Sequence, residues 1–265
     1  ELAFGYNGLQ RLFGRAFGRG GGAAERSIPA LFTAAPAQGG GGPGGTGETG
    51  PKGALRLLNP QLGGQIGWLL PLAAVGLLIG AWQLRPRRPL APASGQQGAL
   101  IIWGGWFLTM AAFFSVAGFF HRYYLTMLAP GAAALVGIGL MTLWRGHRLA
   151  TRCWHGWLLP LALAGTVAVQ LGILREYRAW YDRLAVPVAA ACLVAVAALV
   201  LTRLLARSRP GVARAATLAT AVGLAALLAL PTTWAGLTVA RGSTGNLPVA
   251  GPAEPGEVMF GAPGG

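Results

Sequence analysis

Six long apolar stretches along the chain each read as a membrane-spanning helix. Each contains roughly the 20 residues that an α-helix needs to cross about 30 Å of hydrocarbon, and no Asp, Glu, Lys or Arg lies inside any of them. A helix on the surface of a soluble protein would show a recurring polar face instead. The pattern predicts an all-α membrane protein with about six transmembrane helices, at residues 64–82, 99–119, 125–144, 156–174, 184–202 and 215–237.

The regions that flank these stretches divide the chain into three parts. Residues 1–64 are expected to form an irregular extracytoplasmic region, in which the glycine-rich tract 18–53 is disordered or mobile because it buries too little apolar area. Residues 65–240 form the transmembrane region, and residues 241–265 form a turn-rich extracytoplasmic tail or linker. The chain opens without a Met or a signal peptide, so we expect it to be a piece of a longer protein.

Arginines predict the orientation in the membrane. The formal net charge is +14, and the arginines gather in the gaps after the first, third and fifth stretches. Such gaps lie on the cytoplasmic side in most membrane proteins. Both ends of this chain then lie outside the cell or in the periplasm. The gap at 175–183 also holds three arginines, but Glu176 and Asp182 dilute them.

The same charge surplus in a soluble protein would suggest nucleic-acid binding. Here the arginines sit at the ends of apolar spans, where they set the topology and contact lipid phosphates. We therefore expect membrane lipid as a partner and no nucleic acid.

Small residues and prolines inside the stretches predict close helix packing. Glycines allow two helices to approach closely where lipid supplies no hydrophobic driving force. Prolines are tolerated in a span because neighbouring helices can satisfy the carbonyls that they free. The glycines in question are Gly131, Gly137, Gly139, Gly156 and Gly165, and the prolines are Pro71, Pro130, Pro160, Pro187 and Pro231.

The densest polar and aromatic cluster lies between the second and third stretches. His121, Arg122, Tyr123 and Tyr124 follow one another on a short turn expected at the membrane surface. Arg and His can hold a phosphate while the tyrosines pack on a sugar or lipid. Ordinary interfacial anchoring explains the same residues. The residues alone leave both interpretations open.

Residues for acid–base catalysis are scarce. Of the seven Asp and Glu residues, five lie in the chain ends or in flexible tracts. The loop 174–183 suits a short surface helix, or could cover a substrate cleft. No His, Cys, Asp or Glu cluster has convincing metal-ligand spacing, so no metal site is predicted. A chain of this composition is not expected to run hydrolysis or group transfer by itself.

Several segments together resemble a known family. ELAFGYNGLQRLFG, RLLNPQLGGQIGWLLPLA, the long segment ending in HRYYLTMLAPGAAALVGIG, and GNLPVAGP occur in this order. They resemble the C-terminal half of bacterial glycosyltransferases with the GT-C fold. These enzymes are related to protein O-mannosyltransferases and lipid A aminoarabinose transferases. One departure concerns the usual His-Pro-Tyr-Tyr, in which Arg122 replaces the proline here.

The resemblance implies a GT-C type bundle that transfers a hexose, of the mannose kind, from a polyprenyl-phosphate donor to an acceptor on the outer face. It implies that the catalytic acid, with a divalent metal, belongs to an N-terminal half that this chain does not contain. Carried over by position, four residues would line the donor-phosphate and lipid site, namely His121, Arg122, Tyr123 and Tyr124. Three others would belong to the acceptor-side loop, namely Tyr6, Asn7 and Arg11.

Two other classes of function stay open. A transporter or flippase-like protein would need ionisable residues within its spans, and the apolar stretches offer only Gln170 with a few Thr and Ser. A non-catalytic membrane scaffold subunit needs no such residues. Several more spans and an acidic external loop upstream would favour the enzyme.

Overall fold

The computed structural model describes residues 49–83, 94–118, 120–149, 154–204, 210–241 and 249–252. Six helices in these ranges are long and apolar enough to cross a membrane: Gly63–Gln83, Gly95–Val116, Arg122–Arg148, Trp154–Leu174, Arg178–Leu204 and Gly211–Ala240. Several of these spans combine a short 3-10 segment with the main helix. The protein is an all-α membrane protein, as the sequence predicts, and no strand occurs in the ranges described.

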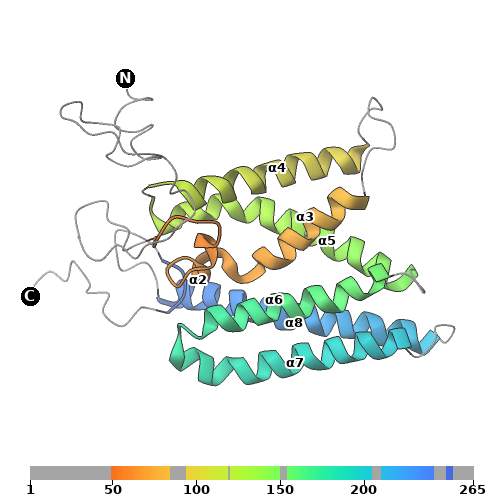
Figure 1. Ribbon diagram of the computed structural model, residues 1–265. Helices are drawn as coiled ribbons and strands as arrows, with labels where there is room; N and C mark the ends of the chain where they lie inside the picture. The colour runs from red at the N-terminus through yellow and green to blue at the C-terminus, as the bar shows by residue number, and fades with distance from the viewer. Residues whose placement is uncertain are drawn as a thin grey trace, which may run out of the picture.

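The helices run back and forth between two ends of the bundle (Figure 1). The first span consists of α2 (Gly63–Ile66), η3 (Gly67–Leu69) and α3 (Leu70–Gln83), and it is followed by α4 (Gly95–Val116). The second half contains α6 (Leu158–Leu174), α7 (Arg178–Leu204) and α8 (Pro210–Arg241). Between the halves, η4 (Arg122–Leu128) leads into α5 (Ala129–Leu149), and η5 (Trp154–Trp157) leads into α6.

The helices form two packed groups. In one group α5 packs against both α3 and α4, and in the other α7 packs against both α6 and α8. Contacts of α3 and α5 with α6 join the groups. Large apolar side chains on the outer surface, among them Val186 and Leu193 at 74% and 69% exposed, suit contact with lipid.

The bundle has two ends, which we name here. Residues 49–62 lead into the first span, and we call them the leader segment. The leader end of the bundle holds this segment with residues 120–128, 174–180 and 249–252, and it lies on the left of Figure 1. The opposite end holds the end of α3, the start of α4, and residues 145–149, 154–157, 203–204 and 210–214. We call it the arginine end, after the described arginines there, namely Arg145, Arg148, Arg203 and Arg214.

Two glycines bring α3 and α5 into backbone contact. A Cβ added at Gly139 would meet the Cα of Gly76, and one added at Gly76 would meet the Leu135 carbonyl of α5. Gly131 likewise lies against the backbone of Phe107 in α4. At Gly76 and Gly139 the backbones approach too closely for any side chain, whereas at Gly131 a Cβ would be tight. Gly137 and Gly165 face open space, so the predicted packing role fails there.

Gln170 bridges three segments inside the bundle. Its Nε2 donates to the Trp68 carbonyl of η3 and to the Leu227 carbonyl of α8, each at 2.9 Å. Leu227 precedes Pro231 by four residues, so the proline has no N–H to offer this carbonyl. A side chain of a neighbouring helix thus satisfies a carbonyl that proline frees, as the sequence analysis expected for prolines in the spans.

Two sequence expectations change at the leader end. Residues 49–53 belong to the tract expected to be disordered, but Thr49 and Gly50 are buried and Gly53 N–H donates to the Ser115 carbonyl at 3.1 Å. The expected surface helix after residue 174 is instead a turn followed by the start of α7 at Arg178. Residues 1–48, 242–248 and 253–265, with Tyr6, Asn7 and Arg11 among them, lie outside the described residues.

Candidate functional site

Arg56 fastens the leader segment to the end of α4. The side chain is 2% exposed. Its Nη1 donates to the carbonyls of Ala117 at 2.6 Å and Phe114 at 3.2 Å, where α4 ends. Its Nη2 and Nε donate to the hydroxyl and carbonyl of Thr49 at 2.7 and 3.1 Å. A cation suits a helix C-terminus, because the last carbonyls of the helix lack partners there.

The environment of Arg56 is partly aromatic. Its guanidinium carbon lies 4.9 Å from the centre of the Phe120 ring. Burial lowers the pKa of the Arg56 guanidinium from its usual value, but arginine starts high enough to keep its charge. Sequence reasoning passed over this residue, since an arginine beside a span is usually a topology signal.

Next to this anchor lie the aromatic rings that the sequence analysis selected. The His121 and Tyr123 rings are stacked, with centroids 5.6 Å apart and planes 8° apart. Tyr124 meets both rings edge-on, at 5.9 Å from His121 and 4.6 Å from Tyr123. The three residues lie where a turn ends and η4 begins, because His121 is extended and caps that helix. We call them the His121 cluster.

Arg122 is arranged differently from its three neighbours. Its side chain is 9% exposed, whereas Tyr123 is 36% exposed. The structure therefore brings His121, Tyr123 and Tyr124 together at the surface and turns Arg122 inward. The binding role of all four residues stays a prediction.

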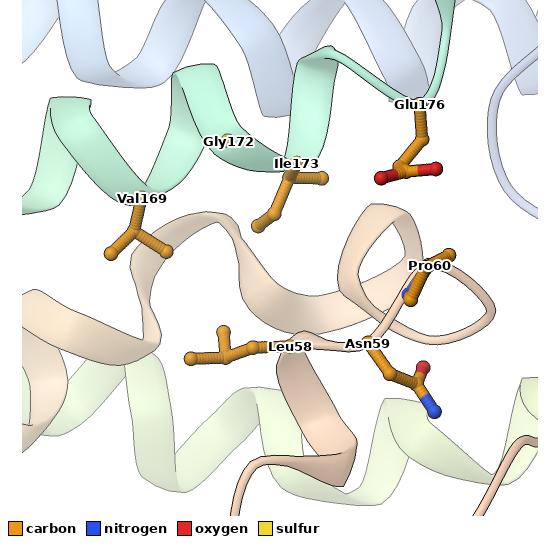
Figure 2. Close-up of a pocket in the computed structure, with 7 residues that line it drawn as sticks. All are labelled: Leu58, Asn59, Pro60, Val169, Gly172, Ile173 and Glu176. Atoms are coloured by element: carbon orange, nitrogen blue, oxygen red, sulfur yellow. The ribbon is translucent and has the colours of Figure 1, made fainter. Parts of the chain in front are cut away.

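A cavity lies beside the same end of the bundle. Its volume is about 230 Å³. The leader segment forms one wall and the last two turns of α6 form the other, as Figure 2 shows. The lining residues are Leu58, Asn59, Pro60, Val169, Gly172, Ile173 and Glu176. We call this space the leader pocket.

Polar groups at the leader pocket come from both walls. Asn59 is fixed by its own turn: its Oδ1 accepts from Leu62 N–H at 2.8 Å, and its Nδ2 donates to the Thr49 carbonyl at 3.1 Å. Glu176 is exposed, and in Figure 2 its carboxylate lies across from Pro60. Typical ligand sites measure about 300–1,000 Å³. The leader pocket thus has room for one small group rather than for a whole lipid-linked sugar.

The short α2 helix connects the two features. It contacts η4, which carries the His121 cluster, and α6, which lines the leader pocket. A Cβ at Gly64 would collide with the Tyr177 hydroxyl, so this turn packs tightly on the loop after α6. In the same GGQIG motif, a Cβ at Gly67 would collide with the Ile173 side chain of α6.

The tail after α8 is strapped to the same end. Gln65 Nε2 donates to the Ala250 carbonyl at 3.0 Å, and Ala250 N–H donates to Gln65 Oε1 at 2.8 Å. Gly251 has a φ of +99°, and a Cβ there would meet the Trp234 indole. Trp234 also meets the rings of three other residues edge-on, namely Trp68, Tyr177 and Trp180. The segment GNLPVAGP therefore has a structural role in its last residues.

Carboxylates are few throughout the described ranges. Glu176 and Asp182 are the two Asp or Glu residues there, and both lie near the leader end. No group of three or more His, Cys, Asp or Glu gathers as a metal site within the described residues. The described part of the leader end can bind and orient polar groups through aromatic rings, amides and one carboxylate.

These features define a multi-pass, all-α membrane protein with polar and aromatic groups gathered at one end of its bundle. Comparison with known proteins narrows this class. The chain is 33% identical to the Bacillus subtilis (strain 168) protein named "Putative mannosyltransferase YkcB", in an alignment covering 95% of the chain. It is 38% identical to "Putative mannosyltransferase YycA" of the same organism, over 77% of the chain.

The chain is therefore related to the GT-C-like mannosyltransferase family that its sequence resembles. It spans 43% of the length of the first relative and 28% of the second. No family model matches the chain, and no solved structure matches it significantly.

Proposed function

We propose that this chain is the C-terminal part of an integral membrane glycosyltransferase. The proposed reaction moves a hexose from a polyprenyl-phosphate donor to an acceptor on the outer face of the membrane. The observation that carries the proposal is the similarity to two proteins named mannosyltransferases, which extends over 95% of this chain in one case. The catalytic acid, with any divalent metal, would lie in the part of the relatives that this chain does not span.

The leader end is the proposed working end. The His121 cluster offers an imidazole and two phenols beside exposed ring faces, which can donate to phosphate oxygens and pack on a lipid or sugar. The leader pocket, at about 230 Å³, would take a single sugar unit through Asn59 and Glu176. The arginines at the opposite end support an orientation of this end toward the outside.

Sugar transfer by the complete protein tests the proposal. The measurement is the transfer of radiolabelled hexose from a polyprenyl-phosphate donor to membrane acceptors, with and without a divalent chelator. His121→Ala and Tyr124→Phe should each lower kcat/KM about tenfold or more, since each removes a charge-assisted or hydroxyl donor from the proposed phosphate site.

Tyr181→Phe is the matched control, because it removes a phenol near the same end that belongs to neither the His121 cluster nor the leader pocket. It should leave the rate unchanged. Wild-type transfer rates in both cluster variants would overturn the assignment of the donor site. Absence of any transfer by the complete protein from several polyprenyl-phosphate sugars would overturn the proposed function.

A further inference from the structure

A second cavity opens at the arginine end, far along the bundle from the proposed working end. Its volume is about 160 Å³. It lies where the last turn of α5, the last turn of α7 and the first turns of α8 meet. The lining residues are His147, Arg148, Thr202, Arg203, Val212, Ala213 and Ala216. We call this space the arginine pocket.

The lining of the arginine pocket has two chemical sides. Helices α5 and α7 supply two guanidinium groups, an imidazole and a hydroxyl, whereas α8 supplies small apolar side chains. A water takes about 30 Å³ in the liquid, so the space holds roughly five waters. A phosphate group is smaller than this space and fits within it.

Packing holds the polar side in position. Arg203 Nη1 donates to the His147 carbonyl at 3.2 Å, and its guanidinium carbon lies 5.3 Å from the centre of the Trp157 ring. Gly156 has no room for a Cβ, because the Arg203 guanidinium lies against it. The buried His147 places its Nδ1 3.1 Å from the Gly156 carbonyl. Binding a ligand here would cost little reordering of these groups.

Arg148 is placed in a similar way at the rim. Its guanidinium carbon lies 5.6 Å from the centre of the Trp144 ring on the same helix, and its side chain is exposed. Stacking on an indole limits the positions of a long side chain while leaving its edge N–H groups directed outward. The two guanidinium groups thus flank a space open to the surface.

Among the described residues, no Asp or Glu lies at this end. The segments 84–94, 145–157 and 203–214 contain no Asp or Glu at all. Glu176 and Asp182 are separated from the arginine end by the length of a span. The same three segments contain ten arginines, namely Arg85, Arg87, Arg88, Arg145, Arg148, Arg152, Arg203, Arg207, Arg209 and Arg214. A pocket lined by two guanidinium groups suits an anionic group.

We propose that the arginine pocket binds the phosphate group of an anionic membrane lipid. Arg148 and Arg203 would contact the phosphate oxygens, with the Thr202 hydroxyl beside them, and Val212 with Ala213 would face the glycerol end of the lipid. The pocket sits at headgroup depth by its place at the end of the spans, which favours a lipid over a free ion. This site is separate from the proposed donor site and does not depend on sugar transfer.

The test uses the complete protein in a neutral detergent and measures bound lipid by native mass spectrometry. The probes are phosphatidylglycerol, and inorganic phosphate as a competitor. Arg148→Gln removes one guanidinium, and Ala213→Leu fills the pocket without a change in charge. Each variant should weaken phosphatidylglycerol binding about five- to tenfold.

Two matched variants control for charge and bulk at the same ends of the same helices. Arg145→Gln and Ala215→Leu change exposed residues that do not line the pocket, and both should bind like the wild type. If millimolar inorganic phosphate displaced the lipid, the arginine pocket would be a site for free phosphate, and the proposal of a lipid ligand would be overturned. Wild-type affinity in both Arg148→Gln and Ala213→Leu, with unchanged melting temperatures, would overturn the proposal.

Discussion

Arg56 shows how a single charged side chain can hold a membrane surface loop in place. It contacts Thr49, which lies seven positions before it in the leader segment. It also contacts Phe114 near the end of α4 and Ala117 just after it, which lie 58 and 61 positions further along the chain. Only the planar guanidinium reaches all of them at once, because its five N–H donors point in fixed directions. The position of the leader segment therefore depends on this one residue.

Replacement of Arg56 should destabilise the leader end. Arg56→Met would leave the Ala117 and Phe114 carbonyls and the Thr49 carbonyl without this donor, at a cost of about 2 kcal/mol or more. The stability of Arg56→Lys should fall between those of the wild type and Arg56→Met, because an ammonium keeps the charge but lacks the planar set of N–H donors. The measurement is the thermal unfolding midpoint of the purified protein in detergent.

An exposed arginine at the same end supplies the comparison. Arg175→Met removes the same charge from an exposed side chain, so it should change stability by no more than about 0.5 kcal/mol. Equal midpoints for Arg56→Met and Arg175→Met would show that the contacts of Arg56 contribute nothing.

At the scale of elements, the packing of α3 on α5 depends on paired glycines. Gly139→Ala should push these helices apart, because its methyl group would meet the Cα of Gly76. The expected cost is about 1–3 kcal/mol, as for other overpacked interfaces. Gly137→Ala, two residues away on the same helix, meets no atom within 4 Å. It should be neutral or stabilising by up to about 1 kcal/mol through helix propensity.

Unfolding of the two alanine variants in detergent, side by side, measures this difference. A loss of stability in Gly137→Ala equal to that in Gly139→Ala would mean that the effect belongs to the helix rather than to the contact with α3.

The elements themselves were largely predictable, whereas their contacts were not. Each apolar stretch coincides with a helix, because hydrocarbon allows no other structure for a single span. The ends of the spans differ from those of the apolar runs: the third begins at Arg122 rather than residue 125, and the sixth ends at Ala240 rather than residue 237. The second, in contrast, ends at Val116, before its apolar run ends at residue 119. Backbone hydrogen bonding continues into the polar flanks, so composition alone misplaces the ends.

The candidate site was predictable only in part for the same reason. His121, Tyr123 and Tyr124 are adjacent in sequence, and local order brings their rings together. The leader pocket joins Asn59 to Glu176, and the tail strap joins Gln65 to Ala250, which is 185 residues away. Such pairs depend on how whole helices pack, and no local pattern in one sequence records that.

For the whole molecule, the two ends differ in chemistry more than in shape. The leader end gathers aromatic rings, amides and the two described carboxylates, whereas the described part of the arginine end gathers cations without a carboxylate. Positive loops remain on the cytoplasmic side during insertion. This asymmetry predicts that the leader end faces outward, and the proposed sugar transfer on the outer face requires that orientation.

Cysteine labelling in intact cells measures the orientation directly. In a background with Cys153→Ser and Cys192→Ser, Ala54→Cys presents a thiol at the leader end and Gln96→Cys presents one at the start of α4. Both positions are exposed. A membrane-impermeant maleimide should label Ala54→Cys in intact cells and Gln96→Cys only after the cells are permeabilised. The reverse result would put the His121 cluster in the cytoplasm, where it could not serve a transfer reaction on the outer face, and would remove the physical basis of the proposed function.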